Sequence, residues 1–173
     1  MSESPPCSLI LVAAGHSRRL PGPVPKIFRV IGGFPLWTIP LKRMLSAYPF
    51  APVVIVGHHD YLDRYREEAK LHTQGVKFEV IPGGERRQDS VRLGLELLEK
   101  YPGNPPLVAI HDAARAWTPT HLIQDVIRVA AREGAALPVV PVADTIKVVE
   151  GGLVKKTIAR EHLCQAQTPQ AFR

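Results

Sequence analysis

Short hydrophobic stretches separated by amphipathic segments set the pattern of the first 142 residues. Two of the stretches, 9–14 and 52–56, are wholly apolar, and three more fall at 76–81, 107–110 and 135–142. Each is too short for a long helix, contains β-branched side chains and lies next to glycine, proline or polar residues. Such runs predict five strands buried in a sheet.

The segments between these strands carry apolar residues three and four positions apart, which is the spacing of one helix face. They predict helices over 35–48, 60–72, 89–100 and 119–133. Pro35 suits the first turn of the first helix, while Pro40 predicts either a kink or a later start. Asp60 and Thr118 are the expected N-caps of the second and fourth helices, and Gly134 is the expected end of the fourth. Asp89 or Ser90 is expected to begin the third.

The periodicity changes after Asp144. Two strand-like runs, 145–149 and 153–158, flank Glu150-Gly151-Gly152, and this pattern predicts a β-hairpin. A hairpin that projects from a compact domain keeps unpaired apolar surface. We therefore expect residues 144–163 to form an arm for a partner subunit, within a single domain over 1–173.

Basic residues exceed acidic ones, 22 against 16, which gives a net charge of +6. Only 6% of the residues are aromatic and the cations are scattered, so phosphorylated small molecules fit the charge better than nucleic acid does. No apolar run reaches the ~18 residues that a bilayer requires, and residues 1–6 do not read as a secretory signal. We expect a cytoplasmic protein with reduced Cys7 and Cys164, although sequence alone leaves a disulfide between them open.

The first candidate site follows the strand over 9–14. Ala13, Ala14 and Gly15 lack bulky side chains, which lets a bound group approach the backbone, and the cations Arg19 and Lys26 come next. Backbone N–H groups and cations in this order suit a polyphosphate. The alternative is an ordinary glycine turn with solvated arginines. The chain contains neither a P-loop nor a dinucleotide-binding fingerprint.

Two further strand ends carry candidate residues. The segment from Gly83 to Val91 is either an ordinary β–α turn with a helix cap, which local physics favours, or a loop in which Ser90 and glycine backbone groups bind a nucleobase. Asp112 follows the strand over 107–110, where α/β sheets place ligands and metals. Its carboxylate is the best candidate to bind Mg²⁺, which takes one or two protein carboxylates together with phosphates and water. His111 reads as a core or hinge histidine.

Several of these motifs resemble known sequences. The segment 13–20, followed by Pro25-Lys26, resembles the nucleotide-binding signature of nucleotidyltransferases that act on sugar and alditol phosphates. Five blocks in order resemble the family of 2-C-methyl-D-erythritol 4-phosphate cytidylyltransferases, namely 13–26, 83–91, 111–115, 144–147, and Arg160 with 168–170. Each block is weakly specific, and their order carries the resemblance. It implies an α/β fold with a Rossmann-like, mostly parallel sheet, helices on both faces and a protruding β-hairpin dimerisation arm.

The resemblance also implies a reaction, the transfer of CMP from CTP to 2-C-methyl-D-erythritol 4-phosphate with release of pyrophosphate. The catalytic cations that hold the triphosphate would be Arg19 and Lys26. The nucleotide-binding residues would be Ala13, Ala14, Gly15, Gly83 and Ser90. Asp112 would bind Mg²⁺. The acceptor-binding residues would be Arg115 and Thr168, with Thr145 and Arg160 delivered across a homodimer.

The implied chemistry agrees with the residue types. An acceptor phosphate is already anionic, so its attack on the α-phosphorus of CTP requires alignment, a metal and charge neutralisation rather than a strong base. The family continues well beyond its Thr-Pro-Gln motif and places a second metal-binding aspartate and a late acceptor-phosphate lysine there. We therefore expect the C-terminal part of the family domain to be absent from residues 1–173.

Three other functions stay open on sequence grounds. The same chemistry on ribitol 5-phosphate or another alditol phosphate depends on few side chains. A non-catalytic nucleotide-binding or dimerisation module would keep the same loops. A nucleic-acid binder is suggested only by the net charge, and a steep salt dependence of oligonucleotide binding would reveal it.

Overall fold

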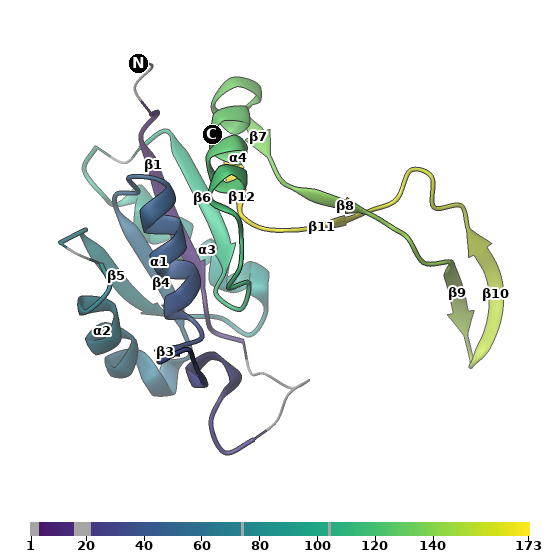
Figure 1. Cartoon of the computed structure of the whole chain (residues 1–173), viewed down its shortest axis with the longest axis horizontal. Helices are drawn as coiled ribbons and strands as arrows, with labels where there is room; N and C mark the ends of the chain where they lie inside the picture. The colour runs from purple at the N-terminus through teal and green to yellow at the C-terminus, as the bar shows by residue number, and fades with distance from the viewer. Residues whose placement is uncertain (1–3, 16–21, 74, 104) are drawn as a thin grey trace.

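The computed structural model describes residues 4–15, 22–73, 75–103 and 105–173. Its centre is a six-stranded sheet in the order β5-β4-β1-β6-β12-β7 (Figure 1). The strands are β1 (Cys7–Val12), β4 (Val53–Gly57), β5 (Phe78–Pro82), β6 (Leu107–Asp112), β7 (Ala135–Ala136) and β12 (Gln170–Phe172). Strands β5, β4, β1 and β6 run parallel, whereas β12 runs antiparallel to both of its neighbours. This confirms the expected α/β fold with a mostly parallel sheet.

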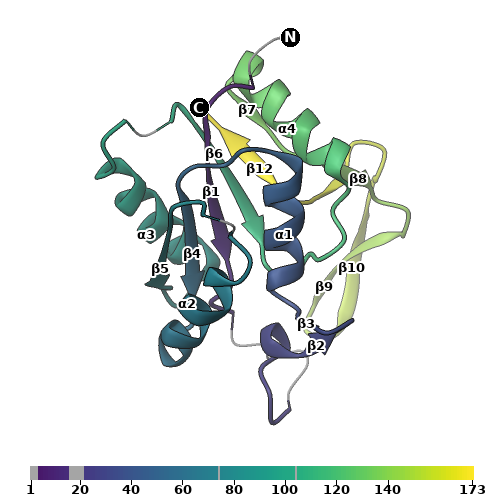
Figure 2. The same ribbon diagram turned by 60° about the vertical axis from the view of Figure 1, so that its left-hand side comes forward.

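Helices cover both faces of the sheet, as expected. On one face, Leu9 and Leu11 of β1 belong to a core cluster with residues of α1 (Thr38–Ala47), α2 (Leu62–Lys70) and α4 (Thr120–Glu133). On the other face, Ile10 packs in a second cluster with residues of α3 (Arg87–Glu99). Figure 2 shows α1 and α4 on the opposite side of the sheet from α3. This double coverage explains why the strand is apolar at successive positions.

The first helix begins later than Pro35, because the preceding residues form other elements. They are the short 3-10 helix η1 (Lys26–Phe28) and the two-stranded ribbon of β2 (Val30–Ile31) and β3 (Phe34–Pro35). Helix α1 then begins at Thr38, which places Pro40 inside its first turn. A backbone N–H has no intrahelical partner there, so proline is tolerated without a kink.

The N-caps expected at Asp60 and Thr118 are both wrong. Asp60 lies in the 3-10 helix η2 (His59–Tyr61), whose cap is the side chain of His58. The hydroxyl of Thr118 donates to the carbonyl of Arg115, and α4 begins only at Thr120. Local propensity identified the turns but could not show which polar group closes them.

The other helix ends are closer to expectation. Helix α3 begins at Arg87, slightly before the predicted start, and the Asp89 carboxylate accepts a hydrogen bond from the Arg86 N–H at 3.1 Å. This is one half of a capping box, because the Arg86 side chain has no acceptor for the return bond. Gly134 ends α4 with a φ of +93°, a conformation in which only glycine is unstrained.

The strand expected over 135–142 is divided between two sheets. After β7, strand β8 (Val139–Pro141) leaves the central sheet and pairs antiparallel with β11 (Cys164–Ala166). The expected hairpin follows as β9 (Ile146–Glu150) and β10 (Leu153–Ile158). We call residues 139–166 the arm, which is longer than the expected 144–163 and projects away from the sheet in Figure 1. Pro138 and Pro141 lack amide donors, which keeps the ladders at this branch point short.

None of the helices within the described ranges is both long and apolar enough to cross a membrane.

Candidate functional site

The parallel strands end at one edge of the sheet, and several predicted site residues lie there. Ala13 follows β1, Gly83 follows β5, and Asp112 is the last residue of β6. Backbone hydrogen bonds join the ends of β1 and β5 to the end of β4. The Ala13 N–H donates to the carbonyl of Val56 and the Gly83 N–H donates to the carbonyl of Gly57, each at 2.8 Å. Strands β4 and β6 lie on opposite sides of β1. Ligands of α/β sheets bind at such a switch in strand order.

The small residues after β1 serve two different purposes. Ala13 and Ala14 are buried, and the Tyr65 hydroxyl donates to the Ala13 carbonyl at 3.0 Å. Burial raises the pKa of Tyr65, so this hydroxyl stays a donor. A Cβ added to Gly57 would lie 2.5 Å from the Tyr65 ring, whereas one added to Gly15 would meet no atom within 4 Å. Of Gly57 and Gly15, only Gly15 therefore has open space beside its backbone among the described residues.

The loop after β5 packs directly against the loop after β1. A Cβ added to Gly83 would lie 2.3 Å from the Cβ of Ala14 and 2.8 Å from the Oγ of Ser90. The Ser90 hydroxyl accepts from the Gly84 N–H at 3.1 Å and donates to the Arg86 carbonyl at 3.4 Å. Ser90 thus holds the shape of the turn, as the cap interpretation expects. Contact of this loop with a nucleobase stays a prediction.

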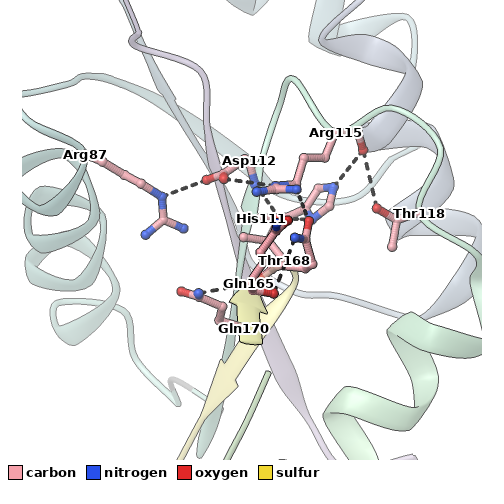
Figure 3. Close-up of polar contacts among 9 residues, drawn as sticks. Arg87, His111, Asp112, Arg115, Thr118, Gln165, Thr168 and Gln170 are labelled. Carbon is pink, nitrogen blue, oxygen red and sulfur yellow. Dashed lines mark hydrogen bonds and ion pairs between the residues drawn. The ribbon is translucent and has the colours of Figure 1, made fainter. Parts of the chain in front are cut away.

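Asp112 is held from two elements. Its Oδ1 accepts from the Arg87 Nε at 2.8 Å, and its Oδ2 accepts from the Arg115 Nε at 3.3 Å (Figure 3). The Asp112 side chain is 28% exposed, so an incoming group can still reach it. Partly exposed ion pairs contribute only about 0–1 kcal/mol to stability. Their main effect is therefore to orient the carboxylate.

Behind Asp112, two buried side chains connect three segments. The Asp112 N–H donates to the Oγ1 of Thr168 at 3.3 Å, which lies 3.0 Å from the Nδ1 of His111 (Figure 3). The other ring nitrogen of His111 lies 3.2 Å from the carbonyl oxygen of Arg115. Burial lowers the pKa of His111 to about 4, so its ring is neutral near pH 7. This confirms that His111 is a core histidine.

Two residues of this network were missed from the sequence, Arg87 and Gln167. Arg87 pairs with Asp112, and the Nη1 of Arg115 donates to the Oε1 of Gln167. Arg87 stands inside the 83–91 block, but only the register of α3 against β6 shows that it faces Asp112. Gln167 directly precedes the Thr-Pro-Gln motif, and nothing in its local sequence indicates a polar partner.

Asp112 has the donor chemistry of a magnesium ligand, since Mg²⁺ prefers oxygen and takes few protein carboxylates. Its two oxygens are shared with Arg87 and Arg115, so a bound cation would compete with those guanidinium groups. Within the described residues, one group of three potential ligands lies close together, His58, His59 and Asp60. Its imidazole nitrogens suit transition metals rather than Mg²⁺.

Lys26 is linked to the same edge through aromatic packing. It begins η1, where Phe28 is buried and its ring centroid lies 4.9 Å from that of Tyr65. Tyr65 in turn bonds to Ala13. Lys26 itself is half-buried and makes no ion pair in the parts of the chain that the structure describes. Arg19, the other predicted catalytic cation, lies outside the described residues.

Thr145 and Arg160 lie in the arm rather than at the sheet edge. Both are exposed, and the Arg160 guanidinium donates to the carbonyl of Ala143, close to Thr145 in the chain. The two predicted acceptor residues are thus neighbours at the base of the β9–β10 hairpin. Arg115 and Thr168, the other two, lie beside Asp112.

Comparisons with known proteins match nearly the whole chain. The family model described as "IspD: 2-C-methyl-D-erythritol 4-phosphate cytidylyltransferase" matches residues 7–173. A bifunctional IspD/IspF enzyme of Granulibacter bethesdensis is 41% identical over 165 residues, which are 95% of this chain and 41% of that protein. The 2-C-methyl-D-erythritol 4-phosphate cytidylyltransferase of Corynebacterium efficiens is 39% identical over 173 residues, with 96% of this chain and 68% of that protein covered.

Solved structures agree with the sequence matches. The 2-C-methyl-D-erythritol 4-phosphate cytidylyltransferase of Thermus thermophilus superposes with a TM-score of 0.67 at 32% identity, covering 96% of this chain and 70% of that one. The chain spans about two fifths of the length of the bifunctional relatives it matches. The match over residues 7–173 shows that the chain belongs to the 2-C-methyl-D-erythritol 4-phosphate cytidylyltransferase family.

Proposed function

We propose that the chain transfers CMP from CTP to 2-C-methyl-D-erythritol 4-phosphate and releases pyrophosphate. The observation that carries the proposal is the contact between the β1 and β5 loops, at Ala14 and Gly83, on the sheet edge where Asp112 ends β6. Membership of the family supports it, and so do the names of relatives such as the Corynebacterium efficiens enzyme.

The proposed reaction is an in-line displacement. An oxygen of the acceptor phosphate forms a bond to the α-phosphorus of CTP, the bond from that phosphorus to the bridging oxygen of the β-phosphate breaks, and pyrophosphate leaves with the electron pair. The attacking oxygen is already anionic, so no protein base takes a proton. The protein aligns the two anions and neutralises their charge.

Each side chain has a place in this scheme. Lys26 and Arg19 neutralise the triphosphate, and the 83–90 loop holds the cytosine. Arg115 and Thr168 contact the acceptor. We place Mg²⁺ on the carboxylate of Asp112, where it would neutralise triphosphate oxygens and stabilise the leaving pyrophosphate. Arg87 and Arg115 hold the carboxylate in position before the metal binds.

A homodimer is part of the proposal. The arm exposes five large apolar side chains that no helix covers, namely Val139, Val140, Val149, Leu153 and Val154. Exposed apolar surface of this kind marks an interface, and a second copy would bury it. Thr145 and Arg160, at the base of the hairpin, would then contact the acceptor in the partner's site. Sedimentation equilibrium tests this, because a monomer at micromolar concentration would exclude it.

We also propose a cytoplasmic location. The two cysteines are free, Cys7 buried and Cys164 exposed, and free thiols persist in reducing compartments.

The decisive assay is pyrophosphate release from CTP with Mg²⁺ and two acceptors in parallel. The proposal expects release with 2-C-methyl-D-erythritol 4-phosphate and much less with ribitol 5-phosphate. Release with ribitol 5-phosphate alone would show that the proposed acceptor is wrong, whereas the proposed cytidylyl transfer would still hold. Binding of CTP without release under either condition would favour a non-catalytic nucleotide-binding module.

A further inference from the structure

One buried side chain of α2 contacts both parts of the proposed triphosphate site. The Tyr65 hydroxyl donates to the carbonyl of Ala13 at 3.0 Å, and the Tyr65 ring packs on that of Phe28. Ala13 begins the loop after β1, and Phe28 belongs to the same 3-10 helix as Lys26. We propose that Tyr65 is a positioning residue, which holds this loop and the helix of Lys26 in the arrangement that lets both reach one triphosphate. The nucleotide part of this inference rests on the proposed function, whereas its structural part does not.

The hydrogen bond to Ala13 is buried at both ends. Tyr65 is 0% exposed and Ala13 is 3% exposed. A carbonyl oxygen can only accept, so the phenolic hydroxyl is the donor. The Ala13 N–H donates in turn to the carbonyl of Val56 at 2.8 Å. The end of β1 is therefore held to β4 through its N–H and to α2 through its carbonyl.

This bond also orients the next backbone donor of the loop. The Ala13 carbonyl and the Ala14 N–H belong to one peptide group, which is planar and trans. In a trans peptide the two groups point in opposite directions, so the Ala14 N–H points away from Tyr65. A backbone N–H that is fixed in direction before a phosphate binds has no orientation to lose on binding. The Tyr65 hydroxyl can therefore act on the triphosphate without touching it.

The Tyr65 ring is held by three other elements. Its centroid lies 4.9 Å from that of Phe28 in η1 and 5.0 Å from that of Trp37, which precedes α1. Both contacts are tilted or edge-on, as aromatic pairs prefer. On the side of β4, a Cβ added to Gly57 would lie 2.5 Å from the ring. Because the ring has no room to move alone, the placement of η1, with Lys26 at its start, is coupled to that of Tyr65.

Two neighbouring side chains of α2 strengthen the same packing. The Arg64 guanidinium lies over the Phe28 ring, 4.1 Å from its centroid. The Glu68 carboxylate accepts from the Arg64 Nε at 2.7 Å and from the Trp37 Nε1 at 2.6 Å. Residues 64, 65 and 68 lie on one face of a helix, because they are three and four positions apart. One face of α2 thus holds both η1 and the end of β1.

The test uses a matched pair of substitutions and one further variant. Tyr65→Phe removes the hydroxyl and keeps the ring. Tyr48→Phe is the control, since Tyr48 is also buried and its hydroxyl also donates to a backbone carbonyl, that of Pro5, before the start of β1. The two hydroxyls thus bond to the chain at opposite ends of the same strand. Phe28→Leu removes the ring contact with η1 and keeps the hydrogen bond to Ala13.

The first readout is hydrogen exchange of the Ala13 amide, followed by NMR without substrate. We expect Tyr65→Phe to speed this exchange by roughly fivefold or more, with the Ile10 amide in the middle of β1 within about twofold of the wild type. Tyr48→Phe should leave both amides within about twofold. Unchanged exchange at Ala13 in Tyr65→Phe, or equal acceleration at Ala13 and Ile10, would overturn the proposal. Because no nucleotide is involved, this result is independent of whether the proposed function holds.

The second readout is CTP binding in the presence of Mg²⁺, measured by calorimetry. Tyr65→Phe should raise the Kd for CTP by about threefold to tenfold, the scale of one intramolecular hydrogen bond, while Tyr48→Phe stays within about twofold. Equal Kd values in the two variants would overturn the nucleotide part of the proposal. A wild type that binds no CTP would contradict the proposed function itself, and the exchange of Ala13 would still test the structural part.

The third readout is steady-state turnover, which separates the two contacts of Tyr65. Phe28→Leu should lower kcat by about tenfold, because Lys26 is then held less well, with Ala13 exchange within about twofold of the wild type. The acceptor KM should stay unchanged in both Tyr65→Phe and Phe28→Leu. Wild-type kcat in Phe28→Leu would show that the placement of Lys26 does not depend on the Tyr65 ring. An effect confined to the acceptor KM would likewise contradict the proposal.

Discussion

The sheet and the arm use similar side chains in opposite ways. Leu9, Ile10 and Leu11 of β1 are 0% exposed, whereas Leu153 and Val154 of β10 are 68% and 61% exposed. The difference lies in coverage, because helices pack on both faces of the sheet, whereas β9 and β10 pair with each other and contribute no residue to either core cluster. The central strands of the sheet are therefore buried by helices of the same chain, whereas the arm leaves apolar surface exposed, which the proposed homodimer would bury.

The proposed roles divide along the same line. The nucleotide and metal residues lie at the edge of the sheet, held by buried strands. Thr145 and Arg160 lie on the exposed arm. In the proposed homodimer, the site would take its chemistry from the sheet and its contacts at Thr145 and Arg160 from a second subunit. Matched substitutions in the two regions separate these contributions.

The largest contrast is in stability. Leu11→Ala leaves a cavity in the sheet and should lower the free energy of unfolding by about 2–5 kcal/mol. Leu153→Ala should change it by no more than ~0.5 kcal/mol when measured at a protein concentration where the chain is monomeric. Urea denaturation of both variants measures the difference. Equal losses would mean that the arm folds against the sheet of its own chain.

The next contrast is in turnover. Lys26→Ala at the sheet edge should lower kcat by ~10²–10³, the scale of losing one preorganised charged donor. Lys155→Ala changes the same side chain in the exposed strand β10 and should leave kcat within about twofold of the wild type. Pyrophosphate release with saturating substrates measures both. Full activity of Lys26→Ala would remove this lysine from the mechanism.

A third contrast concerns the nucleotide. The new methyl group in Gly83→Ala meets Ala14 and Ser90, and overpacking costs about 1–3 kcal/mol. If the strain is relieved by moving the loops, CTP affinity should fall roughly tenfold to a hundredfold. Thr145→Ala in the arm should leave CTP affinity unchanged and raise only the KM of the acceptor. Calorimetry with CTP and Mg²⁺ measures the affinity of both variants. Equal CTP affinity in the two would contradict the assignment of the Gly83 loop to the nucleotide.

The smallest contrast is in the rate at which the two cysteines react with a thiol reagent. Cys7 lies in the sheet and Cys164 lies in the arm. Burial raises the pKa of Cys7 in β1 to about 12, so its thiol stays protonated and shielded at pH 8. Cys164 in β11 is exposed. A disulfide reagent should therefore modify one thiol rapidly in the native protein and a second only after unfolding. Two equally fast thiols would show that the N-terminal strand opens readily.

Much of the central fold could be predicted from the sequence because buried strands and amphipathic helices have distinct periods. The strands β1, β4, β5 and β6 and the hairpin of β9 and β10 appear close to where the pattern places them. The prediction of Asp60 and Thr118 as N-caps was wrong, because several polar groups can accept hydrogen bonds at each of these turns. The prediction of a single strand over 135–142 was also wrong, because the apolar residues of this segment are divided between β7 and β8, which belong to two different sheets.

The site was predictable only in part, for a similar reason. Strand ends identified Asp112 and the loops at Ala13 and Gly83, whose grouping follows from parallel strand order. The pairing of Arg87 with Asp112 depends on how α3 lies against β6, which no local signal reports. One hydrogen-bond partner of His111, Thr168, lies more than fifty residues later in the chain. Hydrogen bonds between distant segments do not produce a periodic pattern in the sequence, so they cannot be predicted from it.

A crystal structure with CTP and Mg²⁺ bound tests the central claim most directly. It should show the cytosine against the loop of Gly83 and Ser90, the metal on Asp112, and Arg19 and Lys26 around one triphosphate. Nucleotide bound elsewhere, or a triphosphate that leaves Asp112 paired only with arginines, would contradict the account.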